Sequence, residues 1–415
     1  MPAQAASWPT TRRSKRTIWV RAARPIDSQQ TFFYRRLFMK PMISLLAATS
    51  VAMLATVSSV QAQDVKLGVV MSNTGTYAFV GTPVINAIRM AFDEMQASNY
   101  FGATKVSLMI EDNRSNTQEA LALLTRMATR DNAVMVIGPV ATGEAMAAAP
   151  VANELKIPIF TTATSPAVLA PGPWVFKVTE TADQYMTLLG EHVAQKRKPK
   201  SCFNITIRDN EGYILQNNVF RDTIKKGGVA IAAEESILSA DTDFTALATK
   251  IANAKADCLF LSTPPEQGAN IILQARQAGM AASTLLVGNT GMGSVNFVKA
   301  GGTAVEGTLF SAESVPTGVN DMAKTFIVNY TKRYNVAPDS WAMVGYSMGL
   351  IAANAIKAAG PNPTRDKVRA AMLSTKNLPV VIGRGTWSIT DPATRVPSFG
   401  YAVMKIQGGK FVEDK

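Results

Sequence analysis

The sequence is poor in the side chains that most often carry catalysis and metal binding. Its 415 residues include one histidine and two cysteines, so it offers no cluster of His and Cys ligands for a metal. Charged residues make up only 17% of the chain and hydrophobic residues 47%, which is typical of a globular protein and not of a disordered one. The length is sufficient for two to three domains of roughly 150 residues each.

Motifs for nucleotides and nucleic acids are also missing. The chain has no G-x-x-x-x-G-K-[ST] phosphate loop, and Gly291-Met292-Gly293 does not continue into a dinucleotide fingerprint. Beyond residue 62 the basic residues are dispersed, without the interleaved aromatic residues of a nucleic-acid surface. We therefore expect no cofactor, no metal and no nucleic-acid partner.

The net charge of +12 is concentrated at the N-terminus. Residues 1–62 hold nine of the 42 basic residues but only one of the 30 acidic ones. Within this segment Lys40 precedes an apolar run, Met42 to Val60, and small residues stand at Val60 and Ala62, the two positions that a signal peptidase reads. This organisation predicts an exported, periplasmic protein whose signal peptide, residues 39–62, is cleaved near Ala62.

The start site and the export route stay open. If Met39 is the true start, the signal is a short Sec-type one and residues 1–38 are an upstream extension with no fold of their own. Alternatively, Arg35-Arg36 ahead of Lys40 resembles a twin-arginine motif. A membrane anchor is less favoured, because the apolar run is rich in Ser and Thr for a span of about 20 residues. No later segment is long and apolar enough to span a bilayer, so we expect a soluble mature chain.

From Val65 onward, short aliphatic or β-branched runs alternate with stretches of helical periodicity. Residues 66–71 form such a run, and Ile85, Ile88 and Phe92 then recur at helical spacing. This alternation is typical of βαβ units with a parallel sheet. The pattern restarts near Lys198-Pro199-Lys200. We therefore predict the α/β class, with two Rossmann-like lobes of similar build.

The predicted lobes are discontinuous in sequence and are joined by three hinge segments. Residues 63–182 and 315–377 are assigned to the first lobe, and residues 183–314 and 378–415 to the second. The chain is then expected to cross between the lobes near residues 179–183, 311–315 and 377–383. Ligands of open parallel sheets bind beyond the carboxyl ends of the strands, where helix N-termini point. The cleft between the lobes is therefore the expected ligand site.

One motif suggests catalysis. Gly345-Tyr346-Ser347-Met348-Gly349 matches the G-x-S-x-G pattern of serine hydrolases. A hydrolase triad of this kind needs a histidine after the serine, and the only histidine, His192, comes far before Ser347. Val344, Met348 and Ile351 also recur at helical spacing, which predicts that Ser347 lies within a helix. We expect no enzyme, and a serine hydrolase using Ser347 stays a remote alternative.

Two loops carry donors suited to an anionic ligand. Residues 138–143 join the third predicted strand to a helix, and residues 161–166 follow the next strand. Their backbone N–H groups and the hydroxyl of Thr142 suit a carboxylate, through charge-assisted hydrogen bonds and the helix dipole. Ordinary capped turns are the alternative. Two successive strand ends of this chemistry, beside a loop with Tyr77 and Phe79, nevertheless favour a binding site.

The two cysteines, Cys202 and Cys258, both fall in predicted strands. An exported protein can pair them, and geometry decides whether it does. We favour small buried thiols.

The sequence resembles a known family, the branched-chain amino-acid type of substrate-binding protein that serves ABC importers. The resemblance covers nearly all of residues 65–415. It is carried by short motifs: Thr74-Gly75 with Ala78 and Gly81, Ile137-Gly138-Pro139, Thr162 to Pro166, Asp209 with Gly212-Tyr213, and Gln274 to Gly279. It implies the type I periplasmic binding fold, ligand capture by hinge closure, and a monomer that partners an inner-membrane permease. A ligand sensor of the same fold, acting on a regulatory partner, is the alternative.

Carried over by position, the resemblance also implies roles for individual residues. One group would bind the ligand carboxylate: Ala141, Thr142, Ala163 and Thr164. Tyr213 would close the cleft from the second lobe, and the loop with Tyr77 and Phe79 would line the pocket for the ligand side chain.

The chain departs from the family at two further predicted ligand-binding positions. Thr290 stands where amino-acid binders usually place an acid for the α-ammonium, and Thr263 stands where an aromatic residue is common. A buried ammonium without a carboxylate partner is costly. We therefore expect a carboxylate that lacks the α-ammonium, such as an aromatic or other organic acid. Glu211 or Glu266 as a substitute partner leaves a branched-chain amino acid open.

Overall fold

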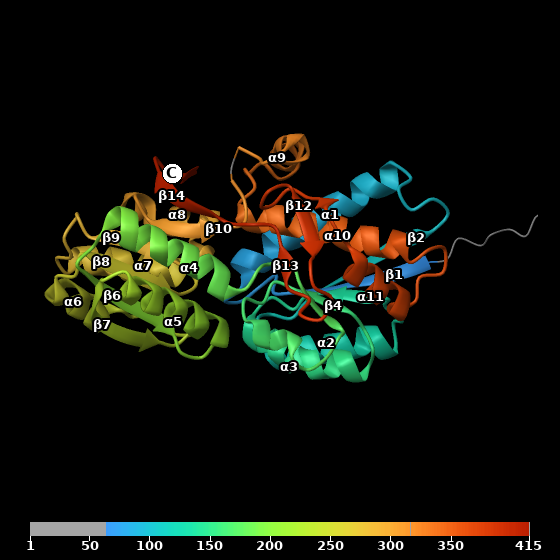
Figure 1. The fold of residues 1–415 in the computed structure, drawn as a ribbon, viewed down its shortest axis with the longest axis horizontal. Helices are drawn as coiled ribbons and strands as arrows, with labels where there is room; N and C mark the ends of the chain where they lie inside the picture. Colours follow the sequence, from blue (N-terminus) through green and yellow to red (C-terminus); the bar gives the residue numbers. More distant parts are fainter. Residues whose placement is uncertain (1–63, 316, 415) are drawn as a thin grey trace, which may run out of the picture. The chain divides into compact units, whose positions relative to one another are not determined.

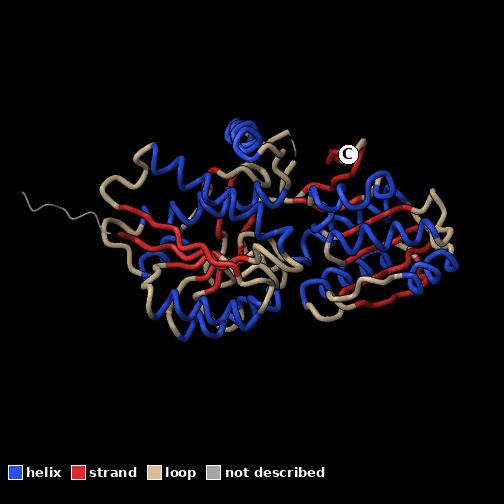
Figure 2. Tube along the Cα trace, turned by 180° about the vertical axis from the view of Figure 1, so that it is seen from behind, coloured by secondary structure: helices blue, strands red, loops and turns tan. Residues whose placement is uncertain are grey.

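The computed structural model describes residues 64–315 and 317–414. The predicted upstream extension and signal peptide lie outside these residues. No helix within them is long and apolar enough to cross a membrane. The described chain contains two large sheets, each with its own helices, and Figure 2 shows helices on both sides of the strands in each. We call these two parts the first and the second lobe.

The first lobe, of which Figure 1 labels β1, β2 and β4, is built on a five-stranded sheet in the order β2-β1-β3-β4-β5, in which all neighbouring strands are parallel. Its strands are β1 (Asp64–Met71), β2 (Lys105–Asp112), β3 (Met135–Ile137), β4 (Ile159–Thr161) and β5 (Val175–Lys177). One face packs against α1 (Ala78–Ala97) and α10 (Ser340–Ala358), and the other against α2 (Thr117–Thr129) and α3 (Thr142–Glu154). Alternate side chains point to opposite faces, which explains why the central strands β3 and β4, covered on both faces, are buried along their whole length and almost entirely apolar.

The second lobe is built on a seven-stranded sheet in the order β15-β14-β10-β9-β8-β6-β7. Five strands are parallel, namely β6 (Ser201–Ile207), β7 (Ala230–Ile237), β8 (Cys258–Ser262), β9 (Leu285–Gly288) and β10 (Leu309–Ala312). β14 (Ala402–Gln407) and β15 (Lys410–Glu413) add an antiparallel edge. Helices α4 (Ala182–His192) and α5 (Glu211–Lys226) cover one face, and α6 (Thr245–Ala254), α7 (Pro265–Gln277) and α8 (Val295–Gly301) cover the other. The predicted α/β class with two parallel sheets is confirmed.

The C-terminal part of the chain is placed differently from our assignment. It contains α9 (Asp321–Tyr334), α11 (Arg365–Ser374) and a small antiparallel sheet of β11 (Leu378–Pro379), β12 (Thr386–Ile389) and β13 (Pro397–Ser398). Trp387 on β12 is fully buried, packs edge-to-face on Phe160 of β4, and donates its indole N–H to the carbonyl of Val178 at 3.0 Å.

This packing moves one of the predicted lobe boundaries. Residues 380–399 belong to the core of the first lobe, whereas we had assigned residues 378–415 to the second. The third passage between the lobes therefore lies at residues 399–401, just before β14, and not at residues 377–383. The reason is that Trp387 and its neighbours are buried against the core of the first lobe.

The two cysteines are paired, so the expectation of free thiols was wrong. Cys202 on β6 and Cys258 on β8 lie opposite each other in register, with their Cα atoms 4.3 Å apart, and are joined by a disulfide bond. Both are fully buried. The sequence places each cysteine in a strand, but it does not reveal that the two strands are neighbours in this register.

Ser347 lies within α10, as its helical spacing predicted. Its side chain is fully buried, and its hydroxyl oxygen accepts a hydrogen bond from the N–H of Val381 at 3.3 Å. The imidazole of His192, at the end of α4 in the second lobe, lies 2.7 Å from the carboxylate of Asp414. The G-x-S-x-G match therefore forms no strand-to-helix turn with an exposed serine.

Candidate ligand-binding site

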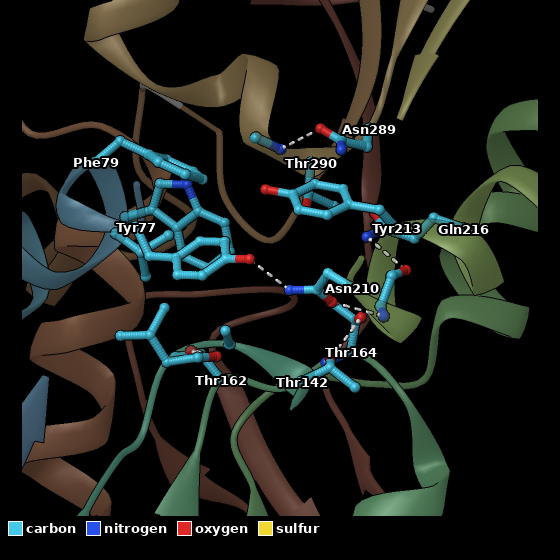
Figure 3. A pocket seen from close by; sticks show the side chains of 16 residues that line it. Tyr77, Phe79, Thr142, Thr162, Thr164, Asn210, Tyr213, Gln216, Asn289 and Thr290 are labelled. Carbon is cyan, nitrogen blue, oxygen red and sulfur yellow. Dashed lines mark hydrogen bonds between the residues drawn. The ribbon is translucent and has the colours of Figure 1, made fainter. Parts of the chain in front are cut away.

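A pocket lies where the carboxyl ends of the parallel strands of both lobes meet, and 16 residues line it (Figure 3). It holds about 440 Å³ of space free of protein atoms, part of it open to solvent. The cavity that a water molecule can occupy measures only about 50 Å³, which is well below the roughly 300–1,000 Å³ of small-molecule sites, so the pocket is narrow in this structure. Seven of the nine predicted residues line it: Tyr77, Phe79, Ala141, Thr142, Thr164, Tyr213 and Thr290.

The other two predicted residues, Ala163 and Thr263, are buried behind the pocket wall. The N–H of Ala163 donates to the hydroxyl of Thr161 at 3.0 Å. The carbonyl of Thr263 accepts from the side-chain amide of Asn289 at 3.1 Å. Both residues brace loops whose neighbours reach the pocket, and they do not line it themselves.

The N-terminus of α3 reaches the pocket through Ala141 and Thr142, and its first turn has N–H groups without a capping side chain. Its N-cap residue is Ala141, which has no side-chain acceptor for the N–H groups of the first turn. The N–H of Ala141 itself is taken by the carboxylate of Glu144 at 3.2 Å. The N–H groups of Thr142 and Gly143 are therefore left without a capping side chain, at the positive end of the helix dipole. Such an uncapped first turn is suited to an anion.

The hydroxyls of the two donor loops are fixed by hydrogen bonds between the loops. The hydroxyl oxygen of Thr142 accepts from the N–H of Thr164 at 3.1 Å, and the two threonine hydroxyls lie 3.2 Å apart. Thr162 donates to the carbonyl of Val140 at 3.0 Å. Because the hydroxyl oxygen of Thr142 already accepts from an N–H, its proton is available either to the hydroxyl of Thr164 or to an acceptor in the pocket. The first lobe thus presents preordered donors to a carboxylate.

The second lobe contributes side chains whose polar groups are mostly used within the protein. Asn210 caps α5: its side-chain oxygen accepts from the N–H of Gly212 at 2.8 Å, and its amide nitrogen donates across the cleft to the hydroxyl of Tyr77 at 2.7 Å (Figure 3). Asn289 accepts from the N–H of Gly291 at 2.9 Å. Burial raises the pKa of Tyr77 to about 12, so its hydroxyl stays protonated.

The two lobes touch directly at Gly212. A Cβ atom added to this glycine would lie 2.6 Å from the hydroxyl oxygen of Thr142 and 2.7 Å from that of Thr164. These separations are shorter than any real contact of a Cβ atom. The first turn of α5 therefore fits against the donor loops of the first lobe only because residue 212 has no side chain.

Aromatic residues form the apolar part of the pocket. The rings of Phe79 and Trp341 meet edge-to-face with centroids 6.3 Å apart, and the side chains of Tyr77 and Tyr213 also reach the pocket (Figure 3). Such a wall suits a flat or branched apolar ligand body. Sequence reasoning missed Trp341, which enters from the first turn of α10, as well as Asn210, Gln216 and Asn289. Asn210 and Asn289 had a local signal, because each precedes a helical turn that it caps.

No Asp, Glu, Lys or Arg is among the residues that line the pocket. Neither predicted substitute partner for an ammonium is among them: Glu211 is exposed, and the carboxylate of Glu266 accepts from the side chain of Asn296 at 2.7 Å. Within the described ranges no group of His, Cys, Asp and Glu is placed to hold a metal ion. An α-ammonium would thus find no charged partner in this wall, whereas a carboxylate would find several donors.

The sequence of this chain is similar to that of known periplasmic binding proteins. A model of the periplasmic binding protein family matches residues 64–410. A Leu/Ile/Val-binding protein homologue of Brucella melitensis is 28% identical over 374 residues, which are 89% of this chain and 99% of the relative.

Two solved structures bear on the fold. A branched-chain amino-acid transporter substrate-binding protein of Streptococcus pneumoniae, in complex with isoleucine, matches with a TM-score of 0.77 at 23% identity, covering 84% of this chain and 98% of the other. An ABC-transporter solute-binding protein of Rhodopseudomonas palustris, in complex with 3,4-dihydroxybenzoic acid, matches with a TM-score of 0.76 at 24% identity, covering 85% and 96%. The type I periplasmic binding fold that the resemblance implied is confirmed, and this chain belongs to the periplasmic binding protein family, in the branched-chain amino-acid-binding type.

Proposed function

We propose that this protein is the extracytoplasmic solute receptor of an ABC importer, and that its ligand is a small carboxylate without an α-ammonium, such as an aromatic acid. The observation that carries the proposal is the lining of the pocket. It combines hydroxyls, an uncapped helix N-terminus and aromatic rings, with no charged side chain. A buried ammonium left unpaired costs several kcal/mol, whereas a carboxylate is stabilised by these donors.

In the proposed mechanism, the ligand carboxylate accepts hydrogen bonds from the hydroxyls of Thr142 and Thr164 and from the first turn of α3. The apolar body of the ligand packs between Phe79, Trp341 and Tyr213. The ligand stabilises the closed form because it touches both lobes only when they are closed. The closed monomer then docks on an inner-membrane permease, and no covalent bond is made or broken.

The competing ligand class is that of the branched-chain amino acids, which the names of the relatives favour. The two classes share the carboxylate and differ in the ammonium. The solved structures of similar fold were determined with ligands of both kinds, isoleucine and 3,4-dihydroxybenzoic acid. The choice between an amino acid and an acid without an ammonium therefore depends on the residues that line the pocket.

A thermal-shift screen tests the proposal directly. The panel is benzoate and 3,4-dihydroxybenzoate against leucine, isoleucine and valine, with benzamide as a neutral control of the same shape as benzoate. A ligand present at 100 times its Kd stabilises the native state by about 2.7 kcal/mol, which raises the melting temperature measurably. We expect a shift with at least one acid and none with benzamide. Stabilisation by the amino acids and by no acid would contradict the assignment of the ligand.

A further inference from the structure

A lysine is buried directly behind the donor loop that follows β4. Lys177 is the last residue of β5, and its side chain is fully buried. Its ammonium donates to the carbonyl of Ala163 and, at 3.3 Å, to the carbonyl of Ser165. These carbonyls belong to the two neighbours of Thr164, whose hydroxyl reaches the pocket. Lys177 itself does not line the pocket, so its ammonium contacts this loop from behind the pocket wall.

This ammonium forms no ion pair with an acidic side chain of the described residues. Burial lowers the pKa of Lys177 to about 7, and only Asp183, in the first turn of α4, opposes this shift. Of the other charged groups on the packed elements, Glu144 on α3 is bonded to Ala141, and Arg395 donates to the carbonyl of Val175 on β5 at 3.2 Å. A buried cation with carbonyl partners alone is costly, and a nearby anion relieves that cost.

We propose that Lys177 is a positioning residue for the ligand, and that the bound carboxylate serves as its counter-ion across the Ala163–Ser165 loop. This inference rests on the proposed carboxylate ligand. The ammonium holds the two carbonyls on the far side of the loop, which leaves the hydroxyl of Thr164 for the pocket side. It also adds positive potential in a dry environment, where charges interact strongly.

Ligand binding should depend on pH if Lys177 has this role. A carboxylate in the pocket favours the protonated lysine, so the pKa of Lys177 rises when the ligand binds. Affinity is then highest below pH 7, where the free protein already carries the charge. Above pH 7 the affinity falls by up to tenfold per pH unit, until the pKa of Lys177 in the complex is reached.

The test is the Kd of benzoate between pH 6 and pH 9, measured by titration calorimetry. The affinity of the wild-type protein for benzoate should be lower at pH 9 than at pH 6 by a factor of about ten or more. Lys177→Arg, which stays charged, should bind with an affinity that does not change over this range. Lys177→Met should bind weakly at every pH, and its melting temperature shows whether it is folded. A pH-independent affinity of the wild-type protein, or full affinity of a folded Lys177→Met, would overturn the inference.

A matched control separates Lys177 from another buried group that titrates in the same range. Burial raises the pKa of Glu313, between the lobes, to about 7. Glu313→Gln should keep the pH dependence, and its loss in that variant would assign the effect to Glu313 and overturn the inference. The NMR signal of the labelled Lys177 side chain should also titrate at a higher pH with benzoate than without it. Failure of all acids to bind at any pH would refute the proposed ligand class itself, whereas binding without pH dependence refutes only the role of Lys177.

Discussion

The two walls of the pocket differ in what they do with their polar groups. In the first lobe, Ala141 leaves the first turn of α3 uncapped, and Thr142 keeps a proton for the pocket. In the second lobe, the side-chain amides of Asn210 and Asn289 form hydrogen bonds with nearby backbone groups and, for Asn210, with the hydroxyl of Tyr77. The first wall leaves hydrogen-bond donors free, whereas the second uses most of its polar groups within the protein.

This difference assigns separate tasks to the two lobes. Under the proposed function, preordered donors in the first lobe set the affinity for the carboxylate, because they need no rearrangement when the ligand arrives. The second lobe would then contribute shape, through Tyr213 and the close approach of Gly212, and control closure. Variants of the first wall should therefore change ligand selectivity, whereas variants of the second should change closure for every ligand.

The largest effect is expected from Gly212→Ala. The added methyl group overlaps the hydroxyls of Thr142 and Thr164, and overpacking of this kind costs up to about 3 kcal/mol, or roughly 100-fold in affinity. The fold of the second lobe should be unharmed, because Gly212 lies in the first turn of a helix, where alanine is favourable. Calorimetry measures the affinity, and small-angle scattering measures the fraction of closed protein with ligand.

Gly143→Ala is the matched control for this variant. Gly143 occupies the same position in α3 as Gly212 does in α5, but a Cβ atom there meets nothing within 4 Å. Its affinity should stay within about threefold of the wild-type value, which is about 0.6 kcal/mol. Equal losses in the two variants would contradict the idea that contact at Gly212 limits closure.

Part of the site could be predicted from the sequence because it depends on local patterns. Each strand of the first sheet ends in a polar loop, and parallel strands bring those loops to one edge. The loops that hold Thr142 and Thr164 could be placed together on that ground, whereas the family resemblance singled out the two residues, whose hydroxyls lie 3.2 Å apart. The aromatic loop with Tyr77 and Phe79 follows β1 and reaches the same edge.

The remainder depends on tertiary packing that no local pattern encodes. Trp341 reaches the pocket because α10 packs along α1, and its ring meets Phe79 far away in sequence. The burial of Trp387 likewise decides to which lobe residues 380–399 belong. The apolar periodicity predicted a helix around Ser347, but it does not show which end of such a helix opens into a cleft.

An intermediate effect is expected from the pair Thr142→Val and Thr290→Val, which removes one hydroxyl from each wall. Loss of a hydrogen bond to a charged group costs about 1.5–3 kcal/mol, so Thr142→Val should weaken benzoate binding by at least tenfold. Thr290 makes no side-chain hydrogen bond within the described chain, and its replacement should cost less than about 0.5 kcal/mol if no ammonium is held there.

The same pair tests the ligand class. If Thr290→Val weakens binding as much as Thr142→Val, the ligand carries a polar group against the second wall. In that case the assignment of the anion to the first wall alone is wrong. Calorimetry with benzoate and with leucine distinguishes these results, because only leucine carries an ammonium.

The smallest effect is expected from Tyr77→Phe, which removes the hydroxyl that accepts from Asn210 across the cleft at 2.7 Å. A single neutral hydrogen bond contributes about 1 kcal/mol, so the affinity should fall about fivefold, mainly through faster dissociation. Burial raises the pKa of Tyr77 to about 12, so this loss should be constant from pH 6 to pH 9, unlike the effect of Lys177.

Tyr334→Phe supplies the control, because the hydroxyl of Tyr334 donates to the carbonyl of Asn86 at 2.8 Å within the first lobe. Loss of this hydrogen bond should lower the melting temperature of the protein. It should not change the dissociation rate of the ligand, which is measured by stopped flow. A hydrogen bond that crosses the cleft stabilises only the closed form, whereas one within a lobe stabilises open and closed forms equally. Equal dissociation rates for Tyr77→Phe and the wild-type protein would therefore mean that closure depends on the fit at Gly212 and not on the bond between Asn210 and Tyr77.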